Sequence, residues 1–363
     1  MKLVIYGAQG YALGAYEALR TLYPKREISC FLVTQMEHNP SYLGGIPVQK
    51  LSAFAENMST EEKQDIEILI ATPEQVQPDI EETLENYGFW QYRRLTFARY
   101  NELMKLFHAS LGRFLPLAAL PVGYCMPFVR IYMAKSYADK PLKNVESLPE
   151  YVFPIQVGAA SGGLRAADIR DDTGENISDK NGNYCELTAL YWIWKNKLVK
   201  VGTEDGEKKQ YYGLCQYRRG FALTEDDLLR LMDNDVDVLL PYPLPYEPDI
   251  GAHHERYVKH TDWQAMLAAL AELQPEYVGA LQEILSQQYL YNYNLILAKK
   301  SVLRDYCEWL FPILARTEEL SVPEGNERAD RYIGYLGESL MTLYFMKNAD
   351  RLNVVHTACR IAV

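Results

Sequence analysis

The sequence lacks the features that mark secreted, disulfide-linked and zinc-binding proteins. Its six cysteines are scattered over 363 residues without a CxxC pair, a pattern that argues against zinc and favours reduced thiols over a disulfide framework. The first residues, MKLVIYGAQG, lack the charged and apolar regions of a signal peptide. We therefore expect a first strand there, a mature protein that begins at its own Met, and a cytoplasmic location.

No apolar run is long enough for a membrane-spanning helix. The longest uncharged stretch, residues 114–129, contains Pro116, Pro121 and Pro127 and is shorter than the roughly 20 residues that a bilayer requires. We expect a linker and a buried strand there. Peripheral contact with the inner face of the plasma membrane is left open, as is the oligomeric state.

Positive charge is also scarce. The formal net charge is -11, which argues against nucleic acid as a partner, because affinity for a phosphate backbone comes from clustered Lys and Arg. The hydrophobic share of 48% and the charged share of 23% are those of an ordinary globular protein. The length suits two domains of common size.

The order of apolar runs predicts an α/β fold that starts twice. Short apolar runs at residues 3–6, 28–33 and 66–71 alternate with a helical stretch at residues 12–22, as parallel strands alternate with crossover helices. A new first strand is expected at residues 129–134, after the Pro-rich stretch. We therefore predict a Rossmann-like parallel-sheet domain, a linker and a second α/β domain, at residues 1–112, 113–127 and 128–363.

The glycines after the first strand do not form a dinucleotide fingerprint. Residues 7–14, GAQGYALG, would let a phosphate approach a helix N-terminus, but their spacing differs from GxGxxG. Residues 33–35 offer no acidic side chain for a ribose. An NAD-dependent sugar-modifying enzyme is therefore disfavoured. The first domain is either a nucleotide or sugar-nucleotide module or an accessory domain whose glycines only shape a turn.

Residues 171–196, DDTGENISDKNGNYCELTALYWIWKN, combine a polar loop with a helical pattern. The loop offers donors and acceptors that suit a nucleotide, and Asn181 or Asn183 would cap the helix that follows. Steps of three, four and three predict one buried face of a single helix, formed by Tyr184, Leu187, Tyr191 and Trp194. Composition alone favours a capped core helix after a surface loop.

Two adjacent arginines end a predicted apolar strand at residues 211–221, YYGLCQYRRGF. The carboxyl ends of strands are where open α/β sheets bind ligands, and the guanidinium forks of Arg218 and Arg219 suit a pyrophosphate. A surface ion pair with nearby carboxylates explains them equally well. A capped helix start at residues 224–227 and a strand at residues 236–240 follow, and residues 202–209 read as an exposed hairpin or loop.

Two further patterns lie near the carboxyl terminus. Residues 291–300 are strand-like, and the helix after them is expected to bury Leu303, Cys307, Leu310 and Leu314. In the motif RYIGYLGESL, helical spacing assigns a core stripe to Ile333, Leu336, Leu340 and Leu343. Arg331, Tyr335 and Glu338 share another face, which is either catalytic or solvated.

Five blocks occur in order between about residues 129 and 345: DDTGENISDKNGNYCELTALYWIWKN, GLCQYRRGF, DVDVLLP, NLILAKK with DYCEWLF, and RYIGYLGESL. Together they resemble a family of bacterial capsular and O-antigen glycosyltransferases, long catalogued as a domain of unknown function and associated with galactofuranosyl transfer. The family pattern before the double arginine reads His-Tyr-Arg-Arg, whereas Gln216 stands here. A role of that histidine is therefore in doubt for this chain, and a shift in donor or acceptor preference is open.

The resemblance implies a GT-A-like α/β domain that binds a nucleotide sugar at the carboxyl ends of its strands. Most such enzymes hold a divalent metal on an Asp-x-Asp motif. Because the strand expected to carry it ends in two arginines here, we expect these cations to replace the metal beside the departing UDP, with no cofactor required. The alternative is Mg or Mn on Asp233, Asp235 and Asp237.

The resemblance further implies an inverting transfer of a sugar, galactofuranose above all, from a UDP-sugar. The acceptor would be an undecaprenyl-linked or free oligosaccharide of capsule, O-antigen or exopolysaccharide synthesis. A carboxylate must take the acceptor proton. Glu338 is our choice, and Asp249, Asp262 and Glu186 are the other candidates. Gln216 keeps open a catalytically inactive nucleotide-sugar-binding module.

The remaining site residues are assigned on the same resemblance. We expect the donor to be bound by Lys135, Asp172, Asn176, Asn181, Glu186, Arg218 and Arg219. We expect the acceptor side to be formed by His254, Asn294, Arg331 and Tyr335, with Trp309 in support; His253 and His254 would orient a phosphate or an acceptor sugar, or are ordinary loop residues.

Overall fold

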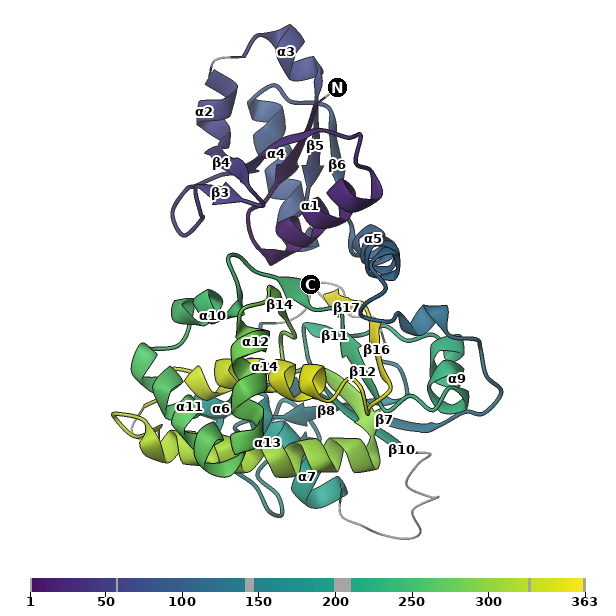
Figure 1. Ribbon diagram of the computed structural model, residues 1–363, viewed down its shortest axis with the longest axis vertical. Helices are drawn as coiled ribbons and strands as arrows, with labels where there is room; N and C mark the ends of the chain where they lie inside the picture. The colour runs from purple at the N-terminus through teal and green to yellow at the C-terminus, as the bar shows by residue number, and fades with distance from the viewer. Residues whose placement is uncertain (1, 57, 141–146, 199–209, 326–327, 362–363) are drawn as a thin grey trace. The chain divides into compact units, whose positions relative to one another are not determined.

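The computed structural model describes residues 2–56, 58–140, 147–198, 210–325 and 328–361 (Figure 1). The chain forms two compact units. The first holds the residues up to Arg113 together with Leu244–Glu247, and the second holds Phe114–Pro243 and the chain from Pro248 onward. The expected linker at residues 113–127 thus lies in the second unit, apart from Arg113. The expected hairpin at residues 202–209 lies outside the described residues.

The first unit is built on a six-stranded sheet in the order β3-β4-β2-β1-β5-β6. All neighbouring pairs are parallel except β3 with β4. The strands predicted at residues 3–6, 28–33 and 66–71 are confirmed within one residue. The bounds are β1 Lys2–Tyr6, β2 Ile28–Val33, β3 Tyr42–Leu43, β4 Ile46–Lys50, β5 Ile66–Ile70 and β6 Tyr92–Arg94.

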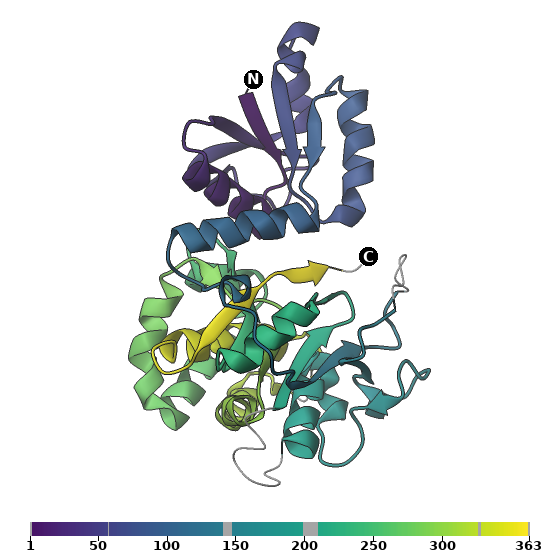
Figure 2. The ribbon, with the colours of Figure 1, turned by 90° about the vertical axis from the view of Figure 1, so that its right-hand side faces the viewer.

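Helices cover both faces of this sheet (Figure 2). On one face, α2 (Leu51–Glu56) and α4 (Gln77–Asn86) pack on Val4 and Ile68 in a common core. On the other face, Tyr16 of α1 (Gly10–Leu22) contacts Phe31, and α5 (Phe97–Ser110) packs on α1. A short helix, α3 (Thr60–Gln64), completes the unit. Strands alternating with helices on both faces make this a Rossmann-like unit.

The turn after β1 depends on a glycine. Gly7 has a φ of +122°, and a Cβ at this position would lie 2.6 Å from the carbonyl oxygen of Ala71. Only glycine tolerates both conditions. At the end of β2, where a dinucleotide fold carries its ribose-binding acid, the Thr34 hydroxyl shares a 2.6 Å hydrogen bond with the Tyr6 hydroxyl.

The second unit is built on a nine-stranded mixed sheet whose main path runs β16-β12-β15-β10-β7-β8-β9. Strand β15 is antiparallel to both of its neighbours, and β11 pairs antiparallel with β10 and β17. Because β7, β8 and β10 are parallel, their carboxyl ends meet at one edge. The bounds are β7 Phe128–Lys135, β8 Val152–Gln156, β9 Ile169–Arg170, β10 Gln210–Gln216, β11 Arg219–Phe221, β12 Val238–Pro241, β15 Ile296–Lys299, β16 Val354–Thr357 and β17 Cys359–Ile361.

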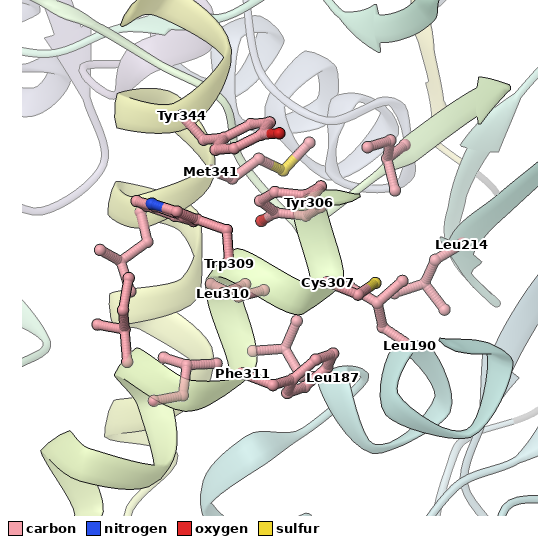
Figure 3. Close-up of a cluster of buried hydrophobic side chains, with 14 of the residues drawn as sticks. Leu187, Leu190, Leu214, Tyr306, Cys307, Trp309, Leu310, Phe311, Met341 and Tyr344 are labelled. Atoms are coloured by element: carbon pink, nitrogen blue, oxygen red, sulfur yellow. The ribbon is translucent and has the colours of Figure 1, made fainter. Parts of the chain in front are cut away.

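One face of this sheet carries the main core. Its helices are α7 (Leu187–Lys197), α11 (His260–Leu273), α12 (Val278–Leu285), α13 (Lys300–Leu320) and α14 (Tyr332–Lys347). Figure 3 shows the side chains of α13 packed between those of α7 and α14. The stripes predicted on α13 and α14 are confirmed, because Leu303, Cys307, Leu310, Leu314, Ile333, Leu336, Leu340 and Leu343 are all fully buried.

The opposite face is covered by α9 (Glu225–Asp233), which contributes Leu231 to a smaller core. The predicted cap of this helix is confirmed: Thr224 accepts from the backbone of Asp227, whose carboxylate accepts in return. Among the helices of the described residues, none is long and apolar enough to cross a membrane.

The helix predicted to carry Tyr184, Leu187, Tyr191 and Trp194 on one face is not continuous, because the chain breaks at Cys185. A short helix, α6 (Asn181–Tyr184), ends before Cys185, whose φ is +50°, and α7 begins at Leu187. Asn181 opens α6 rather than capping it, and its amide donates to the Cys185 carbonyl at 2.7 Å. A local side-chain hydrogen bond of this kind competes with a continuous helix.

Two predicted strands are also interrupted. The strand at residues 211–221 turns back after Gln216, which pairs with Arg219 in a hairpin. In residues 291–300, Tyr293 and Asn294 have positive φ values of 70° and 50°, so that only Ile296–Lys299 forms a strand. The predicted buried face of the helix is confirmed for Tyr184 and Leu187 but not for Tyr191 and Trp194, which are only partly buried, while Trp192 and Ile193 enter the core. Apolar periodicity did not show where the backbone turns.

Asp171 ties the loop after β8 to the start of α7. Its carboxylate is fully buried and accepts from the backbone of Gly158 at 3.0 Å and of Ala159 at 3.1 Å. It also accepts from the hydroxyls of Ser178 and Thr188. Four donors satisfy a carboxylate that burial would otherwise make costly.

We expect Asp171→Ala to lower the free energy of unfolding by about 3 kcal/mol, because it leaves buried donors without an acceptor. Urea unfolding followed by tryptophan fluorescence measures this. The matched control is Asp168→Ala, whose carboxylate is 97% exposed in an ion pair with Arg165 and is worth less than about 1 kcal/mol. Equal losses in the two variants would contradict the structural role of Asp171.

Candidate functional site

Two glutamates converge on one loop of the second unit. Glu186 precedes α7, and its Oε1 accepts from the Asn294 amide at 2.9 Å. Glu338 lies on α14, and its Oε1 accepts from the backbone N–H of Tyr293 at 3.0 Å. A second amide, that of Asn292, donates to Glu338 Oε2 at 3.4 Å. We call Glu186 and Glu338 the acidic pair.

The acidic pair holds protons more tightly than exposed glutamates do. Burial, followed by the charge of Glu186, raises the pKa of Glu338 to about 8, against the opposing effects of the Tyr293 N–H, Asn292 and Arg219. Burial also raises the pKa of Glu186, which the hydrogen bonds from Asn294 and Gln216 and the charge of Arg331 oppose. The two groups therefore titrate together and carry fewer than two negative charges near neutral pH.

Gln216 and Arg219 lie beside this pair at the carboxyl end of β10. The Gln216 amide donates to the Tyr293 carbonyl at 3.2 Å and accepts from Arg219 Nη1 at 3.1 Å. The Arg219 guanidinium also lies over the Tyr293 ring, 4.0 Å from its centroid. Its buried Nε has no hydrogen-bond partner among the described residues. The Arg219 guanidinium is thus held between Gln216 and Tyr293.

Cys185, Arg331 and Tyr335 complete the surroundings of the acidic pair. Arg331 precedes α14 with a left-handed φ of 68°, and its Nε lies 3.4 Å from Cys185 Sγ. Burial and the charge of Glu186 raise the pKa of Cys185 to about 11, so it is a thiol at neutral pH. Burial also raises the pKa of Tyr335. The charge of Arg331 opposes this rise, and the charges of Cys185 and Glu338 add to it.

A cavity of about 1040 Å³ is lined by residues of β7, β8 and β10. It lies on the face of the sheet that carries the smaller core and α9. Its floor is apolar and includes Ile131, Met133, Cys215 and Phe221. Gln216 and Arg219 belong both to its lining and to the surroundings of the acidic pair. Its described ionisable side chains, beside Tyr and Cys, are five basic and two acidic ones: Lys135, Lys140, Arg218, Arg219 and Arg360, and Asp139 and Asp168. In a chain of net charge -11, this cavity therefore carries positive charge.

The structure thus brings together six of the residues chosen from the sequence, Glu186, Arg219, Asn294, Arg331, Tyr335 and Glu338, and it places Lys135 and Arg218 in the adjoining cavity. Sequence reasoning missed Tyr293, whose backbone binds Glu338, and Cys185. Two asparagines inside the strand-like run YNYNLILAKK are the signal that could have revealed the turn at Tyr293.

The predicted loop ligands of the donor make contacts within their own segment. Asp172 is held by Arg170, whose Nε donates to it at 3.1 Å. Asn176 donates to the carbonyl of Gly174 at 2.9 Å. With Asn181 bonded to Cys185, these side chains order the loop and the break before Glu186.

Four other predicted site residues also make structural contacts. Asp249 caps α10 (Ile250–His253) by accepting from the Ala252 N–H at 2.8 Å. Asp262 is fully buried 2.6 Å from an Arg328 nitrogen. The His254 ring stacks on Trp263 at 3.7 Å, and burial lowers its pKa. Trp309 is buried against Tyr277 and Tyr344 in the main core. None of these contacts involves the acidic pair.

The acidic residues of the expected metal alternative do not fit a divalent ion. Asp235 and Asp237 both bind the Lys299 ammonium, which lies 2.9 Å from Asp237. Asp233 accepts from the backbone of Tyr124 and Cys125. An ammonium bound between two carboxylates occupies the position that a cation would need. Within the described ranges, no cluster of three or more His, Cys, Asp or Glu could hold a metal ion.

We expect Glu338→Gln to stabilise the protein at alkaline pH. The folded state keeps the Glu338 proton up to about pH 8, whereas an unfolded glutamate loses it near its usual pKa. The free energy of unfolding therefore falls as pH rises through this window, and the loss persists above it. The variant should melt at least about 2 °C above the parent at pH 9 and at the same temperature near pH 4.

Thermal unfolding across pH 4 to 9 measures this difference. Glu283→Gln is the matched control, because Glu283 is an exposed glutamate on α12 and should show no pH-dependent gain. A Glu338→Gln variant that is no more stable than the parent at pH 9 would show that the carboxylate is not held in its protonated form.

Comparison with known proteins points to one family. No curated protein matches the chain. A solved structure described as the apo form of the WbbM bifunctional glycosyltransferase matches with 27% identity and a TM-score of 0.53. The match covers 64% of this chain and 45% of that one, so the chain spans less than half of that protein's length. This likeness and the two sheets confirm the predicted fold class, a Rossmann-like sheet with a GT-A-like α/β domain.

The family model carries the assignment further. It matches residues 137–349, more than half of the chain, and includes the acidic pair, Gln216 and Arg219. Residues 1–113 of the first unit lie outside the matched range, whereas Leu244–Glu247 lies within it. The chain therefore belongs to the family described as a domain of unknown function, DUF4422.

Proposed function

We propose that the chain is an inverting glycosyltransferase that moves a sugar from a UDP-sugar donor to a glycan acceptor. One observation carries the proposal: a partly buried acidic pair adjoins a positively charged cavity at the carboxyl ends of β7 and β10. The likeness to a structure named as a bifunctional glycosyltransferase supports the class of reaction. Galactofuranose as the sugar, and an undecaprenyl-linked or free oligosaccharide as the acceptor, follow from the family resemblance.

The cavity is suited to the donor. Lys135, Arg218 and Arg219 lie where open α/β sheets bind nucleotides, and their charges complement a diphosphate. Arg219 lines the cavity and also contributes its charge to the surroundings of Glu338. When the bond between the anomeric carbon and UDP breaks, negative charge develops on the leaving phosphate. Guanidinium groups fixed beside it stabilise that charge.

Glu338 is the proposed base. An acceptor hydroxyl attacks the anomeric carbon, its oxygen forms the new glycosidic bond, the bond to UDP breaks, and the hydroxyl proton passes to the Glu338 carboxylate. A raised pKa makes this carboxylate a stronger proton acceptor than an exposed glutamate once it is ionised. The neighbouring Glu186 would stabilise the positive charge of the oxocarbenium-like transition state.

We expect release of UDP from UDP-galactofuranose in the presence of a galactan oligosaccharide, with the same rate in excess EDTA. Glu338→Gln should lower kcat by about 10²- to 10⁴-fold, the usual contribution of a general base, and the exposed control Glu283→Gln should not change it. A coupled assay of UDP release over a panel of UDP-sugars measures this. Loss of turnover in EDTA would restore the metal alternative, and UDP binding without turnover of any donor would indicate an inactive binding module.

We also expect the value of kcat/KM to rise with pH and to level off above about pH 8, because only the ionised Glu338 accepts a proton. Replacing Glu186 by Gln removes a like charge, so the midpoint of this rise should move to lower pH. Initial rates over pH 5.5 to 9.5 measure both profiles. A midpoint that does not move in Glu186→Gln would show that the two carboxylates are not coupled.

A further inference from the structure

A pair of stacked tyrosines extends from the acidic pair to the protein surface. Tyr335 lies on α14, three residues before Glu338, and Tyr257 follows a short helical turn, His254–Arg256. Their ring centroids are 4.8 Å apart with an angle of 23° between the planes. Tyr335 is partly buried, whereas Tyr257 is 48% exposed. The pair therefore presents an aromatic ring beside the proposed base.

The position of Tyr257 is fixed by its neighbours. The His253 ring contacts its edge at 5.5 Å, and the adjacent His254 is stacked on Trp263 of α11 at 3.7 Å. About half of this large aromatic ring stays exposed although its position is held by neighbouring rings. Such a ring is available to a ligand at little cost in conformational entropy.

The chemistry around the two rings suits a sugar. A sugar ring has an apolar face of C–H groups, which packs on an aromatic ring, and an edge of hydroxyl groups, which needs hydrogen-bonding partners. Arg331 is exposed, its Nε is held by Cys185, and its charge acts on Tyr335. The aromatic rings, Arg331 and Glu338 therefore supply both kinds of contact.

The two tyrosines also lie on the side of the acidic pair that an acceptor requires. Gln216 and Arg219 line the donor cavity and act on the pKa values of the acidic pair. Tyr335 lies three residues from Glu338 on α14 and is stacked on Tyr257. In an inverting transfer, the acceptor hydroxyl approaches the anomeric carbon from the side opposite UDP. In this order of neighbouring residues, the acidic pair comes between the cavity and the tyrosines.

We propose that Tyr257 and Tyr335 form the subsite that binds the terminal sugar of the acceptor glycan, with the sugar ring stacked on Tyr257. Tyr257 is then a specificity-determining residue that sequence reasoning did not single out. The inference rests on the proposed function, and it assigns the acceptor to this surface rather than to the cavity.

The test uses the full chain and two probes, methyl β-D-galactopyranoside and methyl β-D-galactofuranoside, observed by saturation-transfer NMR. We expect at least one probe to bind the parent protein and to lose its signal in Tyr257→Ala. Tyr257→Phe and Tyr257→Trp, which keep an aromatic ring, should retain binding. Tyr124→Ala is the matched control, because Tyr124 is a 95% exposed tyrosine in a distant part of the sequence, outside the matched family range.

Steady-state rates with a galactan oligosaccharide give a second readout. Tyr257→Ala should raise the acceptor KM about tenfold, a size expected for the loss of one aromatic contact, and should change the donor KM much less. Probe binding that is absent from the parent or unchanged in Tyr257→Ala overturns the inference, as does an unchanged acceptor KM.

The outcomes separate the subsite from the proposed function. UDP release by the parent without any effect of Tyr257→Ala removes the subsite and leaves the transferase. Binding of a galactoside that depends on Tyr257, without UDP release from any donor, supports the sugar site and contradicts the transferase. Melting curves of each variant confirm that a lost signal does not come from unfolding.

Discussion

The repulsion between two partly buried carboxylates is the constraint around which the second unit is organised. Glu186 and Glu338 come from different helices, more than 150 positions apart in the sequence, and are held against the same loop by Tyr293 and Asn294. Like charges brought together out of water raise the pKa of both groups. Their proximity is unfavourable by itself, so the packing of α7, α13 and α14 in the main core must maintain it.

The residues around the acidic pair lie on irregular stretches of backbone. Cys185, Tyr293, Asn294 and Arg331 all have positive φ without being glycine. Each is next to, or directly bonded to, a member of the acidic pair or its surroundings. Residues with side chains occupy this region only at a cost of about 1–3 kcal/mol each, and such strain concentrates at functional sites. Continuous helices and strands through these positions would point Glu186 and the Tyr293 N–H elsewhere, which is why the interruptions and the site coincide.

The same interruptions explain how much could be predicted from the sequence. Leu303 to Leu314 and Ile333 to Leu343 were assigned to the core because helical spacing reports burial directly, and Thr224 was recognised by its capping pattern. Residue type alone did not separate Glu338 from Asp249 and Asp262, since an acid that caps a helix or pairs with an arginine looks the same in one sequence. Glu186 was named both as a donor ligand and as a candidate base, but its proximity to Glu338 was not foreseen, because that proximity arises only from tertiary packing.

Other acidic residues that are buried or partly buried have a basic partner, and this distinguishes them from the acidic pair. Asp262 is paired with Arg328, Glu318 with Lys180, and Asp237 with Lys299. Near the acidic pair, Arg219 is bonded to Gln216 and stacked over Tyr293, and Arg331 is bonded to Cys185. The charge of Arg331 lowers the pKa of Glu186 and that of Arg219 lowers the pKa of Glu338, against the larger effect of burial. In the transfer that we propose, a pair left partly uncompensated in this way would attract the positive charge that appears during the reaction, so that the electrostatic cost of the folded state would favour a cationic transition state.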